Sequence, residues 1–230
     1  MKFLLTSGGV KNASINHALE ELLGKPVTES NAICIATASY AFPGGAAAAW
    51  RVIAGRSNNP MTDLGWKSLG LLELTALPSM AAEHWVPMLQ ESDALLVGGG
   101  DSLYLCYWMR KSGLADLLPS LPLVYLGVSA GSMVVTPSFG VAYDGWFCRD
   151  APRPANDRPV ADDRALGLVG FSVFPHVDNP RSPDNSMANA EKWSATVPVP
   201  TYAIDDETAI RVVDSAVDVV SEGHWRLFSR

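Results

Sequence analysis

A serine stands between two glycines directly after an apolar run. The pentapeptide is Gly127-Val128-Ser129-Ala130-Gly131, and residues 122–126 precede it. This pattern predicts a strand that ends in a tight turn, where glycines leave room for a bend that exposes the serine hydroxyl. Such a hydroxyl attacks a carbonyl carbon when a nearby base takes its proton. G-x-S-x-G also occurs in turns without chemistry, so a close-packed structural turn is the alternative.

The base for this serine has to come from four histidines. His176 follows the strand-like run 171–174, and we expect it at the loop edge of a sheet, where sites of α/β proteins assemble. His17 and His84 lie inside helical patterns, and His224 follows a turn near the C-terminus. We interpret these three as surface or packing residues. The alternative for His176 is a histidine in an exposed loop.

A catalytic histidine is oriented by an acid, and residues 202–207 end in three adjacent carboxylates. We expect Asp206 to face His176. The other carboxylates that can fill this role are Glu207, Asp205, Asp144 and Asp178. A solvated turn is the alternative for the whole cluster. The chain order of serine, histidine and acid differs from the serine, acid, histidine order of α/β-hydrolases, which argues against an ordinary esterase or lipase.

A glycine turn offers backbone donors for an oxyanion. Gly98-Gly99-Gly100-Asp101 follows a strand-like run and precedes a helical pattern, so its N–H groups can point into the same cleft as the N–H of Ala130. A phosphate-binding turn is the competing functional interpretation. The G-x-G-x-x-G and G-x-x-x-x-G-K-[ST] spacings are both absent from the chain. A purely structural turn is the third possibility.

Four segments in a fixed order carry a resemblance to a known family. They are Gly98-Gly99-Gly100-Asp101, Gly127-Val128-Ser129-Ala130-Gly131-Ser132, Phe174-Pro175-His176-Val177-Asp178 and Ala203-Ile204-Asp205-Asp206-Glu207-Thr208-Ala209-Ile210. Together they resemble the peptidase E (aspartyl dipeptidase) and cyanophycinase group of serine peptidases, from the first strand to about Val213. The resemblance implies a class I glutamine amidotransferase-like fold in which serine replaces the cysteine nucleophile.

The resemblance also implies a role for each site residue. Ser129 is then the nucleophile, His176 the base and Asp206 the third member, with Gly100 and Ala130 as oxyanion donors. The implied activity is hydrolysis of short peptides through an acyl-enzyme. In the aspartyl dipeptidase the acid is a glutamate, so Asp206 departs from that member of the family.

Specificity for an N-terminal aspartate requires a cation in the site. The aspartyl-specific members carry an arginine downstream of the histidine, but residues 185–193 contain none here. Arg181 and Lys192 are the nearest substitutes, and either can also be an ordinary surface charge. A related hydrolase or acyltransferase acting on non-peptide amides or esters, and a non-catalytic binding module, are the alternative functions.

Apolar strand-like runs alternate with helical patterns, which predicts an α/β fold with a mostly parallel sheet and helices on both faces. The resemblance implies that this arrangement is flavodoxin-like. We expect residues 1–230 to form one domain, with short C-terminal strands as an antiparallel extension. The expected strands are 2–6, 32–38, 69–74, 94–97, 123–126, 171–174, 209–213, 217–220 and 225–228. The expected helices are 12–23, 46–53, 80–90 and 102–111. Residues 149–164 form a polar insertion that we interpret as a lid or a surface loop.

The composition of the chain limits which kinds of binding partner we expect. The net charge is −7 with scattered lysines and arginines, so we expect no nucleic acid. The N-terminal apolar stretch is too short for a signal peptide or a membrane span and fits a first core strand, and the three cysteines are too dispersed for a disulfide framework. We therefore expect a cytoplasmic protein without contact to membranes. No metal-ligand spacing is present, and we expect neither a metal nor a cofactor. The oligomeric state is open, a homodimer included.

Overall fold

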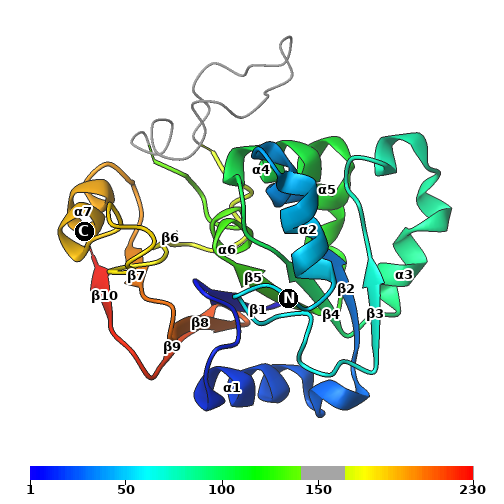
Figure 1. Cartoon of the computed structure of the whole chain (residues 1–230), viewed down its shortest axis with the longest axis horizontal. Coiled ribbons are helices and arrows are strands. Elements are labelled where there is room, and N and C mark those ends of the chain that lie inside the picture. Colours follow the sequence, from blue (N-terminus) through cyan, green and yellow to red (C-terminus); the bar gives the residue numbers. More distant parts are fainter. Residues whose placement is uncertain (141–163, 230) are drawn as a thin grey trace, which may run out of the picture.

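A computed structural model of the chain describes residues 1–140 and 164–229. Within these residues ten strands form one sheet of seven strands and one of three (Figure 1). Most of the insertion 149–164, together with Asp144, lies outside the described residues. None of the described helices is both long and apolar enough to cross a bilayer. That residues 1–230 form a single domain stays a prediction.

The seven-stranded sheet has the order β3-β2-β4-β5-β1-β8-β9. Its strands are β1 (Lys2–Thr6), β2 (Asn31–Ile35), β3 (Ser68–Leu71), β4 (Ala94–Val97), β5 (Val124–Val128), β8 (Thr208–Val213) and β9 (Ala216–Ser221). The first five in this list run parallel to one another, while β8 is antiparallel to β1 and β9 is antiparallel to β8. The predicted mostly parallel α/β sheet is therefore confirmed.

Helices cover both faces of the central strands β2, β4, β5 and β1, which explains why these strands are almost entirely apolar, whereas the edge strands β3 and β9 are largely exposed. Leu4 packs with α1 (Ala13–Leu23) on one face. Phe3 and Leu5 point to the other face. The helices with residues in that second cluster are α3 (Val86–Gln90), α4 (Ser102–Lys111), α5 (Leu114–Leu117) and α6 (Ala130–Met133). Figure 1 shows α1 below the sheet and α4 and α5 above it.

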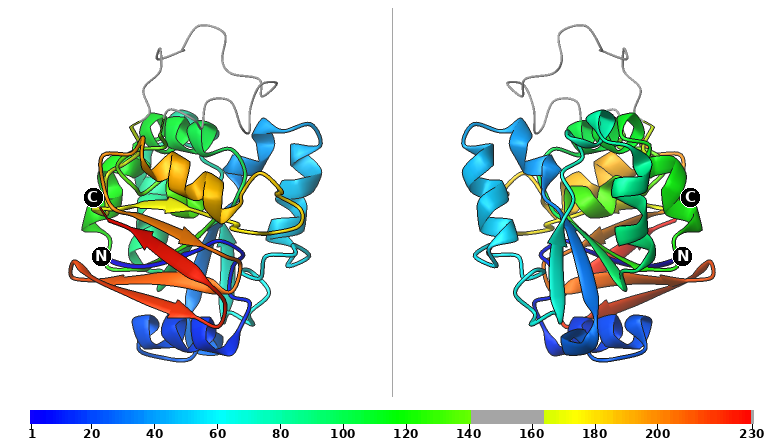
Figure 2. Two further views of the ribbon diagram at one scale, coloured as in Figure 1. Left: turned by 90° about the vertical axis from the view of Figure 1, so that its left-hand side faces the viewer. Right: turned by 90° about the vertical axis from the view of Figure 1, so that its right-hand side faces the viewer.

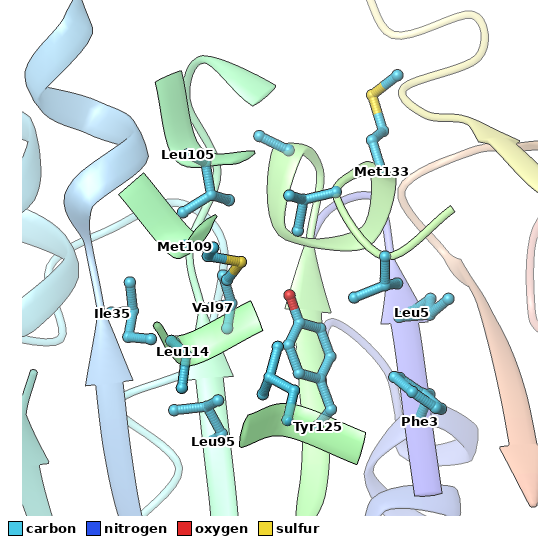
Figure 3. Close-up of a cluster of buried hydrophobic side chains, with 14 of the residues drawn as sticks. Phe3, Leu5, Ile35, Leu95, Val97, Leu105, Met109, Leu114, Tyr125 and Met133 are labelled. Carbon is cyan, nitrogen blue, oxygen red and sulfur yellow. The ribbon is translucent and has the colours of Figure 1, made fainter. Parts of the chain in front are cut away.

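Tyr125 lies at the centre of the second cluster and connects it to the start of α6 (Figure 3). Its side chain is fully buried, and its hydroxyl donates a hydrogen bond to the carbonyl oxygen of Gly131 at 2.7 Å. Burial raises the pKa of Tyr125 well above its usual value, so the hydroxyl keeps its proton and remains a donor. This contact fixes the first turn of α6 above β5.

The three-stranded sheet has the order β10-β7-β6 and stands beside the large one (Figure 2). Its strands are β6 (Ser172–Phe174), β7 (Thr201–Ile204) and β10 (Trp225–Phe228), and α7 (Met187–Ser194) packs on it through Trp193 against Phe174. The predicted antiparallel extension is right for β8 and β9. Residues 225–228 were expected in the same sheet, but they pair with β7 in the small sheet.

Two further expectations are wrong in detail. Residues 80–90 do not form one helix, because Pro87 has no N–H to continue a helix from the preceding turn, and α3 begins only at Val86. The second strand ends at Ile35 and not at residue 38. The helix expected at 46–53 is α2 (Gly45–Ile53). Short 3₁₀ turns occupy Val27–Glu29, Thr37–Ala41, Leu77–Ser79, Ala82–His84 and Leu118–Ser120.

The two glycines around Ser129 are required by close approach of backbones. A Cβ atom on Gly131 would lie 2.1 Å from the carbonyl oxygen of Val97 on the neighbouring strand, and one on Gly127 would lie 2.8 Å from the carbonyl oxygen of Gly131. Neither glycine has a positive φ. Their role is therefore to let α6 lie directly against the ends of β4 and β5.

We expect Gly131→Ala to lower the free energy of unfolding by about 3 kcal/mol or to prevent folding, because the new methyl group meets backbone that cannot rotate away. The measurement is urea denaturation. Gly170→Ala is the matched control, since nothing lies within 4 Å of its Cβ position, and it should change stability little. Equal stability of the two variants would rule out close approach as the reason for Gly131.

Candidate active site

Ser129 occupies a strained turn between β5 and α6. Its φ is 52° and its ψ −111°, a backbone conformation that residues other than glycine rarely adopt. The N–H of Ser129 donates a hydrogen bond to the carbonyl oxygen of Thr6 at 2.9 Å, which ties the turn to the end of β1. The side chain is only partly buried, so the turn presents the hydroxyl group at the edge of the sheet.

His176 follows β6 and reaches Ser129 from the small sheet. Its Nε2 atom lies 2.9 Å from Oγ of Ser129, and its Nδ1 atom lies 2.7 Å from Oδ1 of Asp206. A carboxylate only accepts hydrogen bonds, so the neutral imidazole carries its proton on Nδ1 and Nε2 accepts from the serine hydroxyl. The N–H of His176 donates to Oγ of Ser7 at 2.6 Å, which fixes the backbone on which the imidazole stands.

Asp206 lies between β7 and β8, and both of its oxygens have donors. Oδ1 faces His176, while Oδ2 accepts from Nδ2 of Asn179 at 2.7 Å and from Nζ of Lys11 at 3.3 Å. Burial raises the pKa of Asp206, but the hydrogen bond and charge of His176 and the charge of Lys11 lower it more, to about 2. The carboxylate is therefore charged at neutral pH.

The neighbouring carboxylates point elsewhere. Asp205 accepts from Oγ1 of Thr208 at 2.6 Å and from the N–H of His224 at 2.7 Å, and Glu207 accepts from Nδ2 of Asn12 at 3.1 Å. Asp178 lies 3.0 Å from Nε2 of His224. Among the described residues, the carboxylate that contacts His176 is thus that of Asp206.

The remaining histidines are engaged away from Ser129. His17 lies 3.4 Å from Glu21, and His84 lies 3.8 Å from Glu83, both at exposed positions. His224 bridges Asp178 and Asp205. The part of the chain that the structure describes holds no group of three or more histidine, cysteine, aspartate or glutamate side chains that can bind a metal ion.

The glycine turn after β4 faces the serine. A Cβ atom on Gly99 would lie 3.2 Å from Cβ of Ser129, whereas Gly100 has a φ of 145° and turns toward the backbone of Ala38. Among residues 1–140 and 164–229, the N–H groups of Gly99, Gly100 and Ala130 have no hydrogen-bond acceptor. These three donors are available to a substrate oxygen beside Ser129.

An open pocket of about 800 Å³ lies over this constellation. Ser129, His176, Asp206 and the Gly98–Gly100 turn line it. Its cationic lining residues are Lys11, Arg51, Arg56 and Arg181. Arg181 is therefore at the pocket, as sequence reasoning allowed, whereas Lys192 on α7 is not among its lining residues.

Sequence reasoning missed several residues of the site. The backbone N–H of His176 donates to Ser7, and the carboxylate of Asp206 accepts from Lys11 and Asn179. The pocket is also lined by Arg51 and Arg56. The signal for Ser7 and Lys11 was present, because polar residues follow the first apolar run just as they follow the strand before Ser129. No local pattern marks the two arginines, which belong to α2 and the loop after it.

The comparisons of this chain with a family model and with curated proteins agree with one another. The model of Peptidase family S51 matches residues 3–220. A protein named peptidase E from Streptomyces coelicolor is 29% identical over 153 residues, which cover 62% of this chain and 58% of that protein. A probable alpha-aspartyl dipeptidase from Drosophila melanogaster is 27% identical over 152 residues, covering 61% and 58%. The chain thus matches a little over half the length of these curated relatives.

A solved structure supports the fold. The crystal structure of a Listeria monocytogenes protein, named there as a candidate peptidase E, superposes with a TM-score of 0.65 at 19% identity and covers 96% of this chain and 98% of that one. At this identity the similarity concerns the fold alone.

The charge of Asp206 predicts a pH dependence of stability. Its folded pKa of about 2 lies below the unfolded value of about 4, so its contribution to stability is complete above pH 4 and is lost as the pH falls toward 2. Between pH 5 and pH 2, the free energy of unfolding of the wild type should therefore fall by ~2 kcal/mol more than that of Asp206→Asn, which lacks this carboxylate. Urea denaturation at each pH measures this. Ser129→Ala keeps every carboxylate and should follow the wild type, and equal slopes for all three proteins would contradict the prediction.

Proposed function

The chain belongs to Peptidase family S51, and from this membership and the geometry of the site we propose that it is a serine peptidase that hydrolyses short peptides. The observation that carries the proposal is the continuous chain of hydrogen bonds from Ser129 through His176 to Asp206, at 2.9 and 2.7 Å. This is the arrangement that a hydroxyl nucleophile needs at neutral pH.

In the first half of the reaction, Oγ of Ser129 attacks the carbonyl carbon of the scissile amide while Nε2 of His176 takes its proton. Asp206 holds the proton on Nδ1 and stabilises the imidazolium that forms. Collapse of the tetrahedral intermediate breaks the C–N bond as His176 passes the proton to the leaving amine. The product is an acyl-enzyme on Ser129 and a free amine.

The negative oxygen of the tetrahedral intermediate needs donors that are in place beforehand. We assign this role to the N–H groups of Gly100 and Ala130. Each such donor is worth ~3 kcal/mol of transition-state stabilisation in enzymes of this type. The N–H of Gly99 belongs to the same turn and is the nearest alternative to Gly100.

Hydrolysis of the acyl-enzyme repeats these steps with water as nucleophile. His176 takes a proton from water, the hydroxide adds to the ester carbon, and the proton returns to Oγ of Ser129 as the ester bond breaks. The partial exposure of Ser129 and His176 allows water to reach the ester.

The pocket and the relatives support the proposed substrate class. A volume of about 800 Å³ is typical of sites for small ligands and suits a peptide of a few residues. One curated relative is named as a probable alpha-aspartyl dipeptidase. Cationic side chains at the pocket favour an acidic peptide, so cleavage after an N-terminal aspartate is the more specific form of the proposal. A cytoplasmic location and a homodimer stay predictions from the sequence.

Covalent labelling tests the roles of the site residues. A fluorophosphonate should label Ser129 in the wild type, as located by mass spectrometry of the digested protein. Labelling should be lost in Ser129→Ala and strongly reduced in His176→Ala, because the hydroxyl then lacks its base. His84→Ala, at an exposed position away from the pocket, should label like the wild type. A folded wild type without labelling would favour a non-catalytic binding module.

Substrate panels separate a peptidase from a related hydrolase. We expect turnover of dipeptides, with Asp-X among the best, and a loss of about 10⁴-fold in kcat for Asp206→Asn, because the histidine is no longer held in the productive tautomer. The measurement is amine release from a dipeptide set beside simple esters. Cleavage of esters alone would refute the peptidase and leave the esterase or acyltransferase alternative.

A further inference from the structure

The glycine turn after β4 has no side chains of its own to hold its shape. Its three residues carry only backbone, and glycine has the largest conformational freedom of any residue. At the two ends of the turn, backbone N–H groups donate to the carbonyl oxygens of Ile35 and Ala38, at 2.9 and 3.0 Å. These contacts fix the ends of the turn but not the orientation of the peptide unit that joins Gly99 to Gly100.

The hydroxyl group of Ser39 contacts that peptide unit. Oγ of Ser39 donates to the carbonyl oxygen of Gly99 at 3.2 Å, across 60 residues of sequence. Ser39 is buried and belongs to the 3₁₀ turn Thr37–Ala41. A Cβ atom on Gly100 would lie 2.3 Å from the carbonyl oxygen of Ala38, so the glycine turn packs directly on the backbone that carries Ser39.

The carbonyl of Gly99 and the N–H of Gly100 belong to one peptide unit. This unit is planar and trans, so the two groups point in opposite directions. A hydrogen bond that holds the carbonyl toward Ser39 therefore holds the N–H away from Ser39. Among residues 1–140 and 164–229 that N–H has no hydrogen-bond acceptor. Gly99 lies against the candidate nucleophile, because a Cβ atom on it would stand 3.2 Å from Cβ of Ser129.

A peptide unit between two glycines rotates easily, since neither residue has a Cβ atom that opposes a change in φ and ψ. Rotation by half a turn would exchange the directions of the Gly99 carbonyl and the Gly100 N–H. The partial negative charge of the carbonyl oxygen would then repel an oxyanion that the N–H would otherwise bind. The hydrogen bond from Ser39 opposes this rotation. It also polarises the amide, which makes the N–H a stronger donor.

We propose that Ser39 is a positioning residue whose hydroxyl group holds the Gly99–Gly100 peptide unit, so that the N–H of Gly100 faces the negative oxygen that forms when Ser129 attacks a carbonyl carbon. Ser39 acts through the backbone and does not touch the reacting atoms. The inference rests on the proposed function, because this oxyanion forms only if Ser129 is a nucleophile. Ser39 should therefore affect the rate of the chemical step and not the affinity for a ground-state ligand.

The test measures the rate at which a fluorophosphonate labels Ser129. Oγ of Ser129 bonds to phosphorus, its proton passes to His176, and fluoride leaves, while negative charge grows on the phosphoryl oxygen. Loss of an oxyanion donor costs about 10²–10³-fold in rate, and Ser39→Ala loosens the donor without removing it. We expect the maximal labelling rate to fall about tenfold and the half-saturating concentration to change by less than about twofold.

Ser30→Ala is the matched control. Ser30 is fully buried, and its Oγ donates to the carbonyl oxygen of Pro26 at 3.0 Å, away from the pocket. This variant loses the same kind of hydrogen bond and should label at the wild-type rate, while urea denaturation compares the stability of the two variants. A wild-type rate in Ser39→Ala, or an equal loss of rate in both variants, would overturn the proposal.

The phosphorus-31 NMR signal of the labelled protein reports directly on the hydrogen bonds to the phosphoryl oxygen. The resonance of labelled Ser39→Ala should differ from that of the labelled wild type, and the resonance of labelled Ser30→Ala should coincide with it. A slower rate with an unchanged resonance would place the effect of Ser39 elsewhere and refute the positioning role. The same conclusion follows if weaker binding of the label accounts for the whole loss of rate, because Ser39 would then contact the ligand itself.

Dipeptide cleavage separates this inference from the proposed function. If Ser39→Ala slows labelling as expected while the wild type cleaves no peptide, the positioning role stands and the peptidase proposal fails. If dipeptides are cleaved with equal kcat by the wild type and Ser39→Ala, the peptidase proposal stands and the role of Ser39 fails. A wild type that is neither labelled nor active would refute both.

Discussion

The hydroxyl group of Ser7 joins the two sheets, and the candidate site depends on that junction. Ser7 stands at the end of β1 and is fully buried; its Oγ accepts from the N–H of His176 at 2.6 Å and donates to the carbonyl oxygen of Ile204 at 3.2 Å. The preceding Thr6 carbonyl accepts from the N–H of Ser129. Ser129 follows β5 of the large sheet, whereas His176 follows β6 of the small sheet and Asp206 lies between β7 and β8. Thr6, the last residue of β1, and Ser7, the residue after it, therefore hold Ser129 and His176 at their distance from each other.

The sharp turn at Ser129 is stabilised by what surrounds it. A non-glycine residue with a φ of 52° costs on the order of 1–3 kcal/mol, and such strain persists only where neighbouring contacts enforce it. Here the enforcing contacts are the Thr6 carbonyl, the buried hydroxyl of Tyr125 on the carbonyl of Gly131, and the close approach that two glycines permit. The partly buried hydroxyl group of Ser129 is thus held in place by the packing beneath it.

Electrostatics divide the site into a negative interior and a positive rim. Asp206 stays charged because the hydrogen bonds and charges of His176 and Lys11 lower its pKa more than burial raises it. In the proposed reaction this charge would stabilise an imidazolium at His176. Toward solvent, the residues that line the pocket include Arg51, Arg56 and Arg181. The site therefore combines one charged carboxylate beside the imidazole with exposed arginines at the pocket.

The sequence by itself determined the mostly parallel sheet, the serine turn and the choice of His176 among the histidines, and it favoured Asp206 within a group of carboxylates that stayed open. Each of these rests on a local pattern, namely an apolar run followed by glycine or polar residues at the end of a strand. Only the tertiary structure decided that β6, β7 and β10 form a separate sheet, because the sequence of an apolar strand does not specify which strand it pairs with. The same holds for Ser7, Lys11 and Asn179, whose hydrogen bonds join segments far apart in the chain, and for Arg51 and Arg56, which line the pocket from α2 and the loop after it. Spatial proximity, which folding alone creates, turned these ordinary polar residues into parts of one site.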